Sequence, residues 1–268
     1  MFLADCHTHS LCSPDSSTPM TEMAKKALEY GLNTLCLTDH CDLLSLEGER
    51  TPDYDWTPVL DQRREMLDAY GTKLDLPLGI EFGMGFLSPE DADRILSQPG
   101  LDFVIGSVHN LTEDRGGGDF YFLPYETQAE CYEALDNYFQ SMIQLAAGKY
   151  YDVVGHIIYP LRYMRNRPFP LPDMNRYRDE IHEILRLAAD SGRGMEINTW
   201  KGQTLGEWIP LLKMFRELGG EIVTVGSDAH APEPVGRGVR ESYQMMRDCG
   251  FRYVAVYHRR KPDMIKLR

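Results

Sequence analysis

Two imidazoles and a carboxylate alternate in the segment Asp5-Cys6-His7-Thr8-His9. Residues 1–6 have the apolar character of a β-strand, and alternate side chains of a strand point to the same face. If the strand continues, Asp5, His7 and His9 therefore share one face. Neutral imidazole is a common metal ligand, and a nearby carboxylate can bind the same ion or orient a ring through its second nitrogen. Because one such motif is more often structural, metal binding requires further ligands from other strand ends.

Further candidate ligands occur where other predicted strands end. Six of the eight histidines lie at such positions, whereas His182 falls in a predicted helix and His258 near the C-terminus. A single catalytic zinc needs about three protein ligands, so this set is sufficient for two or three ions. Imidazole with carboxylate favours zinc, iron or manganese over calcium or magnesium. The candidate metal ligands are His7, His9, Asp15, His40, Glu81, His109, His156, Asp228 and His230.

The elements that position these residues follow a repeated order of apolar strand, polar loop and helix. We predict seven such units, with strands at 1–6, 33–37, 76–80, 101–108, 151–155, 194–197 and 222–225. Helices are expected at 19–30, 59–70, 89–96, 126–147, 175–190, 208–218 and 239–249, with a last extended segment at 253–257. The polar segment 41–56 and the Pro- and Arg-rich segment 157–173 are expected to be irregular loops. This order predicts a parallel sheet covered by helices. Polar residues recur at the C-terminal strand ends, where barrel enzymes build their sites, so a closed barrel is favoured over an open sheet.

Composition limits the class of protein. The chain of 268 residues has a net charge of −13, which argues against a general nucleic-acid surface. It contains no apolar run long enough for a transmembrane helix and no segment typical of a signal peptide. No Gly/Ser-rich linker divides it, which predicts one domain over residues 1–268.

The six cysteines are scattered and form no CxxC pair. This pattern indicates reduced thiols and a cytoplasmic protein. Cys6, Cys12 and Cys41 lie beside candidate ligands, and we expect them to pack as small apolar residues rather than bind metal.

The chain resembles the PHP (polymerase and histidinol phosphatase) superfamily from residue 5 to 230. Its length and the arrangement around His156 and Arg162 are similar to the stand-alone histidinol-phosphatase branch. The resemblance implies an α/β fold, a distorted (β/α)7 TIM-like barrel, with a centre of three divalent transition-metal ions (Zn, Fe or Mn). It rests on His7-Thr8-His9, Thr38-Asp39-His40, Glu81, His109, His156 and Asp228-Ala229-His230.

The resemblance also implies which residues share an ion. One ion would bind His7, His9, Glu81 and Asp228; a second would bind Glu81, His109 and His156; a third would bind Asp15, His40 and His230. Some relatives carry His where this chain has Asp15, which could change the metal preference. Asp5 and Asp39 would orient imidazoles.

Candidate catalytic residues are Asp228, Glu81 and His230. Glu81 would bridge two ions, and a hydroxide between the cations would attack phosphorus in line. Either Asp228 or a metal-bound water would protonate the leaving oxygen.

Substrate contacts are expected from other strand ends and loops. Arg162 and Lys201 are the cations nearest the strand ends, and Arg suits bidentate phosphate binding. The alternative for a loop arginine is a solvated surface charge. Glu196 and Asn198 would meet a polar or cationic part of the substrate, with a buried ion pair as the alternative for Glu196.

These features predict a metal-dependent phosphomonoesterase that hydrolyses L-histidinol phosphate to L-histidinol and phosphate in histidine biosynthesis. No nucleic-acid or membrane partner is expected, and the oligomeric state is left open. One rival keeps the site but changes the substrate to a phosphotyrosine protein or a nucleotide. Another is a non-catalytic metal-binding module, although the ligand set is complete.

Overall fold

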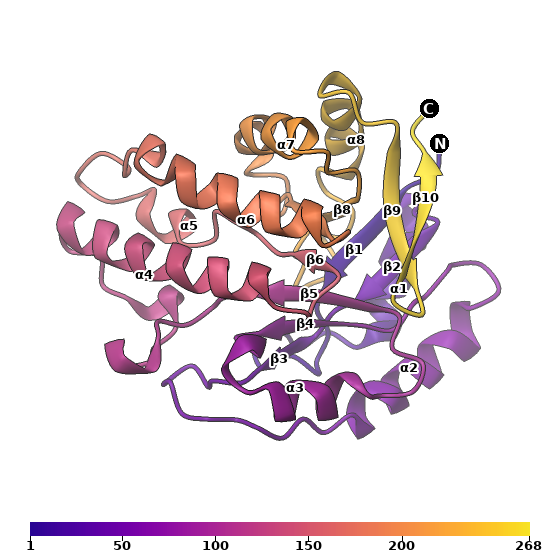
Figure 1. Cartoon of the computed structure of the whole chain (residues 1–268). Coiled ribbons are helices and arrows are strands. Elements are labelled where there is room, and N and C mark those ends of the chain that lie inside the picture. The colour runs from indigo at the N-terminus through magenta and orange to yellow at the C-terminus, as the bar shows by residue number, and fades with distance from the viewer.

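A computed structural model describes residues 1–268 as a barrel of parallel strands surrounded by helices (Figure 1). Strands β3 to β8 form a six-stranded parallel sheet in chain order, and β1 pairs with β2. Two backbone hydrogen bonds join β8 to β1: Asp228 N–H donates to His7 O at 2.9 Å, and His9 N–H donates to Ala229 O at 2.8 Å. An isolated parallel bridge between Leu37 and Leu78 connects β2 to the start of β4. The ring is therefore closed, as predicted.

The barrel is distorted at two places. Where β2 ends, β3 replaces it as the partner of β4, and β6 has only two residues. The strands are β1 (Ala4–Thr8), β2 (Thr34–Leu37), β3 (His40–Asp42), β4 (Gly79–Gly83), β5 (Phe103–Ser107), β6 (Val153–Val154), β7 (Gly194–Asn198), β8 (Val223–Gly226), β9 (Tyr253–His258) and β10 (Lys261–Lys266).

The seven predicted strands are present as β1, β2 and β4 to β8. Strand β3 lies partly in the segment 41–56, which we predicted to be an irregular loop, and this prediction is wrong for its first residues. A strand of three residues is defined by its pairing with β4 rather than by any pattern of its own. The segment 157–173 likewise contains the short helix α5, and the extended segment at 253–257 is half of a hairpin with β10.

The helices begin and end close to the predicted positions because local caps define their ends. At α4, the Thr127 hydroxyl accepts from Glu130 N–H while the Glu130 carboxylate accepts from Thr127 N–H, a reciprocal capping box. Gly31 ends α1 in the left-handed conformation at φ 86°. The helices are α1 (Met20–Tyr30), α2 (Thr57–Tyr70), α3 (Pro89–Leu96), α4 (Gln128–Ala147), α5 (Leu161–Met164), α6 (Arg178–Asp190), α7 (Trp208–Glu217) and α8 (Val239–Asp248).

The helices pack on the outside of the barrel and bury one apolar face each. Tyr138 and Phe139 of α4, for example, are fully buried and belong to the main core. No helix combines the length and the apolar character that crossing a membrane requires.

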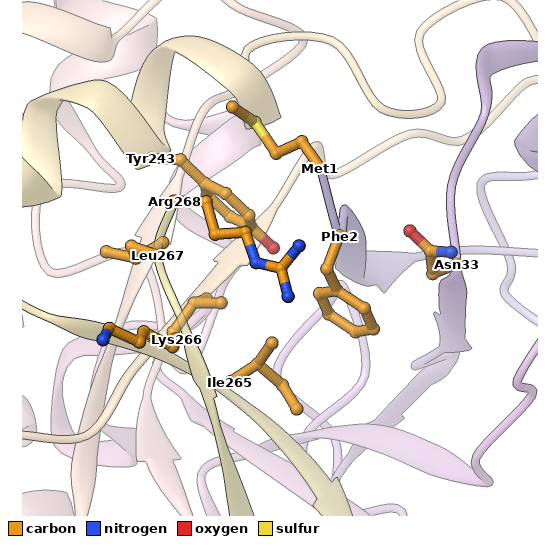
Figure 2. Close-up of a pocket in the computed structure, with 9 residues that line it drawn as sticks. Met1, Phe2, Asn33, Tyr243, Ile265, Lys266, Leu267 and Arg268 are labelled. Atoms are coloured by element: carbon orange, nitrogen blue, oxygen red, sulfur yellow. The ribbon is translucent and has the colours of Figure 1, made fainter.

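A pocket of about 370 Å³ lies between the start of the chain and β10 (Figure 2). Its walls include Phe2, Asn33, Tyr243 and Ile265. Phe2 precedes β1 and Asn33 precedes β2, so the pocket lies at the N-terminal end of these strands. The candidate ligands follow the opposite ends of the strands, and this pocket is therefore not part of their site.

Candidate metal centre

Glu81 lies at the centre of the predicted ligand cluster, near the C-terminal ends of the barrel strands. Its side chain is 1% exposed. Glu81 Oε2 is 3.1 Å from His7 Nε2, while Glu81 Oε1 is 3.1 Å from His109 Nε2 and 2.5 Å from His156 Nε2. Three strand ends thus bring imidazoles to one buried carboxylate.

The ligand atoms form four overlapping groups, within each of which they lie within 4.8 Å of one another. Two of these groups reproduce the implied sets for the first two ions, apart from Asp228, whose Oδ1 is 3.4 Å from His9 Nε2. The group that contains the third implied set (Asp15, His40 and His230) also includes His9. The groups are His7, His9 and Glu81; Glu81, His109 and His156; His9, Asp15, His40 and His230; and His40, Asp42 and His109.

In three of the imidazoles, Nδ1, the ring nitrogen that points away from the cluster, already has a hydrogen-bond partner. His7 Nδ1 lies 2.5 Å from Glu196 Oε1, and His109 Nδ1 lies 2.7 Å from Asp42 Oδ1. Ser13 Oγ donates to Asp39, so His9 Nδ1–H donates to Ser13 Oγ at 3.0 Å. Ionised carboxylates only accept hydrogen bonds, so each of these Nδ1 atoms carries a proton, and in the neutral ring Nε2 then keeps its lone pair for a metal ion.

In the neutral rings, the Nε2 atoms of His7 and His9 therefore face one another as acceptors, and those of His109 and His156 converge on Glu81 Oε1. His7 Nε2 lies 3.1 Å from His9 Nε2, and His109 Nε2 lies 3.3 Å from His156 Nε2. Two lone pairs at these distances repel unless a cation lies between them. The residues present thus fit divalent metal ions, which imidazole and carboxylate ligands bind well.

The electrostatics of the site agree with cation binding. Burial lowers the pKa of His109, but the negative charges of Asp42 and Glu81 outweigh it and raise that pKa to about 10. The same negative charges would attract a metal ion, whose binding displaces the proton from Nε2. Burial would raise the pKa of Glu81, yet the surrounding imidazoles hold it well below its usual value. Burial and the neighbouring His230 and His40 lower the pKa of His9, which favours the neutral ring that binds metal.

Neither Asp5 nor Asp39 hydrogen-bonds an imidazole nitrogen directly. Asp39 can orient His9 through the Ser13 hydroxyl, whereas Asp5 has no such link to a ring. Asp5 accepts hydrogen bonds from Ser227 N–H and Gly236 N–H, each at 2.8 Å. Asp39 accepts from Ser10 and Ser13 and reaches His9 only through the Ser13 hydroxyl. Backbone amides and hydroxyls of neighbouring loops are the partners instead, and they come close only when the chain is folded.

Glu196 and Asn198 lie behind the ligands rather than in the mouth of the barrel. Both side chains are essentially inaccessible. Glu196 binds His7 Nδ1 and accepts from His156 N–H at 3.0 Å, while Asn198 Nδ2 donates to Asp228 Oδ2 at 3.1 Å. These contacts favour the alternative of a buried pair for Glu196 and a structural role for Asn198 over the predicted substrate contact.

Asp42 is a functional candidate that the sequence reasoning missed. It lies two residues after His40 on β3, and its carboxylate accepts a hydrogen bond from His109 Nδ1. The same alternation of polar residues drew attention to His7 and His9, and it was the available signal here.

Arg162 lies in α5 and reaches the metal ligands, as a phosphate-binding role requires. Its Nη1 donates to Asp228 Oδ2 at 2.6 Å, and its guanidinium lies 5.3 Å from the Tyr159 ring and 5.4 Å from the Trp200 ring. Lys201 is half-buried in a left-handed turn with φ 60°, and its side chain has no hydrogen-bond partner. Arg165, the residue that follows α5, forms an ion pair with Glu207.

The cysteines are free thiols, and none belongs to a ligand group. Cys6 and Cys41 are buried among apolar residues, and Cys12 is half-buried against the main core. These surroundings agree with the expectation that the three cysteines pack as small apolar residues.

Three comparisons show which known proteins this chain is similar to. A family model described as PHP domain matches residues 5–200. A probable histidinol-phosphatase from Clostridium acetobutylicum is 30% identical over 255 residues, which cover 93% of this chain and 95% of that relative. The crystal structure of a histidinol phosphate phosphatase from Lactococcus lactis, complexed with zinc, L-histidinol and phosphate, is 26% identical. It superposes with a TM-score of 0.84 and covers 97% of this chain and 98% of that one.

Proposed function

The chain belongs to the PHP domain family, and we propose that it is a metal-dependent phosphomonoesterase that hydrolyses L-histidinol phosphate to L-histidinol and phosphate. The observation that carries the proposal is the set of overlapping ligand groups sharing Glu81 and His9 at one end of the barrel. The similar Lactococcus lactis enzyme, complexed with zinc, L-histidinol and phosphate, supports the choice of substrate.

We propose three divalent ions, of zinc, iron or manganese, held by the nine predicted ligands, with Asp42 orienting His109. Bound ions of this kind supply an activated water nucleophile and stabilise charge on phosphoryl oxygens. Glu81 lies between the groups and is suited to hold two ions. His230 pairs with Asp15 at 2.8 Å in the most exposed group, where it would hold the third ion.

The protein's own cation at the site is Arg162. One guanidinium nitrogen holds Asp228, and its remaining N–H groups are available to bind a phosphoryl oxygen. Burial opposes the charge on Asp228, but Arg162 and His7 hold its pKa well below the usual value. An ionised Asp228 suits a metal ligand better than a proton donor, so we assign protonation of the leaving oxygen to water.

We further propose that residues 1–268 form one domain, because the closed barrel uses strands from β1 to β8. A cytoplasmic location is supported by the six free thiols, which persist in reducing compartments. The molecular partner is a small phosphate ester.

Steady-state kinetics of the zinc-replete protein test the substrate. We expect kcat/KM to be much higher for L-histidinol phosphate than for phosphotyrosine, nucleoside monophosphates or p-nitrophenyl phosphate. A preference for phosphotyrosine or nucleotides would contradict L-histidinol phosphate as the substrate, but the assignment as a phosphomonoesterase would stand. Absence of turnover for every ester in a metal-replete sample would indicate a binding module.

A further inference from the structure

Asp119 lies beside the metal centre, on a loop that is fixed to the exit of β5. Phe120 N–H donates to His109 O at 2.9 Å, and Asp119 forms an antiparallel bridge with Asn110. Asp119 N–H also donates to Leu46 O at 3.1 Å. These hydrogen bonds hold the backbone around Asp119 against His109, a candidate metal ligand, and against Asn110, which follows it.

The carboxylate of Asp119 is buried without a counter-ion. It is 7% exposed and forms no ion pair with any Lys or Arg. Its Oδ1 accepts from Tyr121 N–H at 2.7 Å and lies 3.5 Å from Tyr159 Oη, whereas Oδ2 has no hydrogen-bond partner. Burial raises the pKa of Asp119, and the opposing effects of His109, the Tyr121 N–H and His40 do not cancel that rise.

Aromatic side chains lead from the metal ligands past Asp119 to the surface. The Tyr159 ring lies 4.8 Å from the His156 ring, and Tyr163 packs edge-on against both Tyr159 and Tyr121. Tyr121 and the neighbouring Phe122 are about three-fifths exposed, at 59% and 60%. Adjacent exposed aromatics are typical of a binding surface, and their faces attract cations.

We propose that Asp119 and this aromatic wall (Tyr121, Phe122, Tyr159 and Tyr163) form the subsite for the cationic organic part of the substrate, with Asp119 Oδ2 accepting a hydrogen bond from its ammonium group. The inference rests on the proposed function, because L-histidinol phosphate carries a primary amine beside its phosphate ester. The bound ammonium supplies the missing counter-ion, while the aromatic wall covers the apolar part. Glu196 cannot take this role, since His7 and His156 occupy its carboxylate.

Asp119→Asn tests the charge without removing the structural contact. The Asn side-chain oxygen still accepts from Tyr121 N–H, so the cap of the turn Phe120–Phe122 is kept. Two esters are compared: L-histidinol phosphate and 3-(imidazol-4-yl)propyl phosphate, which differs only in lacking the amine. Asp114→Asn is the matched control, because Asp114 is an exposed acid of the same loop.

We expect Asp119→Asn to lower kcat/KM for the amine ester by about 10- to 100-fold, the effect of losing one charged hydrogen bond. Turnover of the deamino ester and zinc content should stay unchanged, and Asp119→Glu should recover part of the loss. Equal losses on both esters, or no loss on either, would overturn the role of Asp119. Wild-type protein that hydrolyses neither ester would instead reject the proposed function.

Discussion

At the scale of single residues, the outer nitrogen of an imidazole decides how its inner nitrogen can act. Glu196 holds His7, Asp42 holds His109 and Ser13 holds His9, each through Nδ1. His156 differs, because its buried Nδ1 has no partner. Ligands held in this way keep one tautomer and one ring orientation, which is what metal binding requires.

Glu196→Gln should weaken metal binding rather than substrate binding. The neutral amide holds His7 less firmly than a carboxylate, and the loss of such a partner typically lowers metal affinity or activity by about 10- to 100-fold. Zinc affinity from a competition titration measures the effect. Glu217→Gln changes an exposed side chain of α7 and should have no effect. Normal zinc affinity combined with a raised KM would show that Glu196 contacts the substrate rather than orienting His7.

At the scale of elements, the site depends on how closely β8 approaches β1. A Cβ atom at Gly226 would overlap His7 Cβ and lie 2.7 Å from Glu196 Oε1. Only glycine lets β8 pass behind the His7–Glu196 pair. The position of a metal ligand is thus set by a residue that carries no side chain.

Gly226→Ala should displace His7 and lower zinc content. Overpacking of a buried position typically costs about 1–3 kcal/mol, so the free energy of unfolding should fall as well. Elemental analysis and denaturant unfolding measure the two effects. Gly206→Ala is the control, because a methyl group at Gly206 would meet no other atom within 4 Å. Unchanged zinc content in Gly226→Ala would show that β8 can move away without disturbing the site.

The hairpin β9–β10 is attached to the barrel through His258. Its Nδ1 lies 2.7 Å from Asp263 and its Nε2 lies 3.1 Å from Asp75, which precedes β4. Burial lowers the pKa of His258, but the hydrogen bonds to Asp75 and Asp263 outweigh it and raise the pKa above 6.5. The protonated ring therefore stabilises the folded state.

His258→Gln should reduce stability at low pH more than at high pH. A raised folded-state pKa contributes stability that is complete below the unfolded value of 6.5 and is lost as pH rises through the folded value. Because the ring is partly exposed, the difference should be modest. Urea unfolding of both proteins at about pH 6 and about pH 9 measures it. A difference that grows with rising pH would contradict the assigned sign.

At the scale of the whole molecule, the barrel gathers acidic and imidazole groups at one end. Glu81 and Asp228 are buried there and ionised, and they contribute to the net charge of −13. Metal ions would neutralise this end and hold together strand ends that are far apart in the chain. The bound ions should therefore stabilise the fold as well as serve catalysis.

Removal of metal should lower the melting temperature, and zinc should restore it. A ligand at about 1,000 times its dissociation constant adds about 4 kcal/mol to the free energy of unfolding. Calorimetry before and after chelation, with readdition of zinc, measures the change. His182 lies outside the site, so the melting temperature of His182→Ala should respond to metal as that of the wild type does. Glu81→Ala should lose most of this response. Identical melting temperatures with and without metal would contradict the proposed centre.

Local sequence patterns were enough to predict the seven parallel strands, the positions of the main helices and the cluster of candidate ligands His7, His9, Glu81, His109 and His156. These features are local: apolar runs, caps and the polar residue that follows a strand can each be read from a short stretch of neighbouring residues. Parallel strands that close into a barrel must bring their ends together, so the ligands converge without further information.

The partner of each polar side chain, in contrast, depends on the folded arrangement of the whole chain. Glu196 and Asn198 follow the same pattern of polar residues at a strand end as the ligands do, yet β7 directs them behind His7 and Asp228. Asp119 has no pattern of its own, and its place beside His109 comes from a loop that returns to β5. Hydrogen bonds between segments distant in the chain set these positions, and no local sequence signal encodes such a pairing.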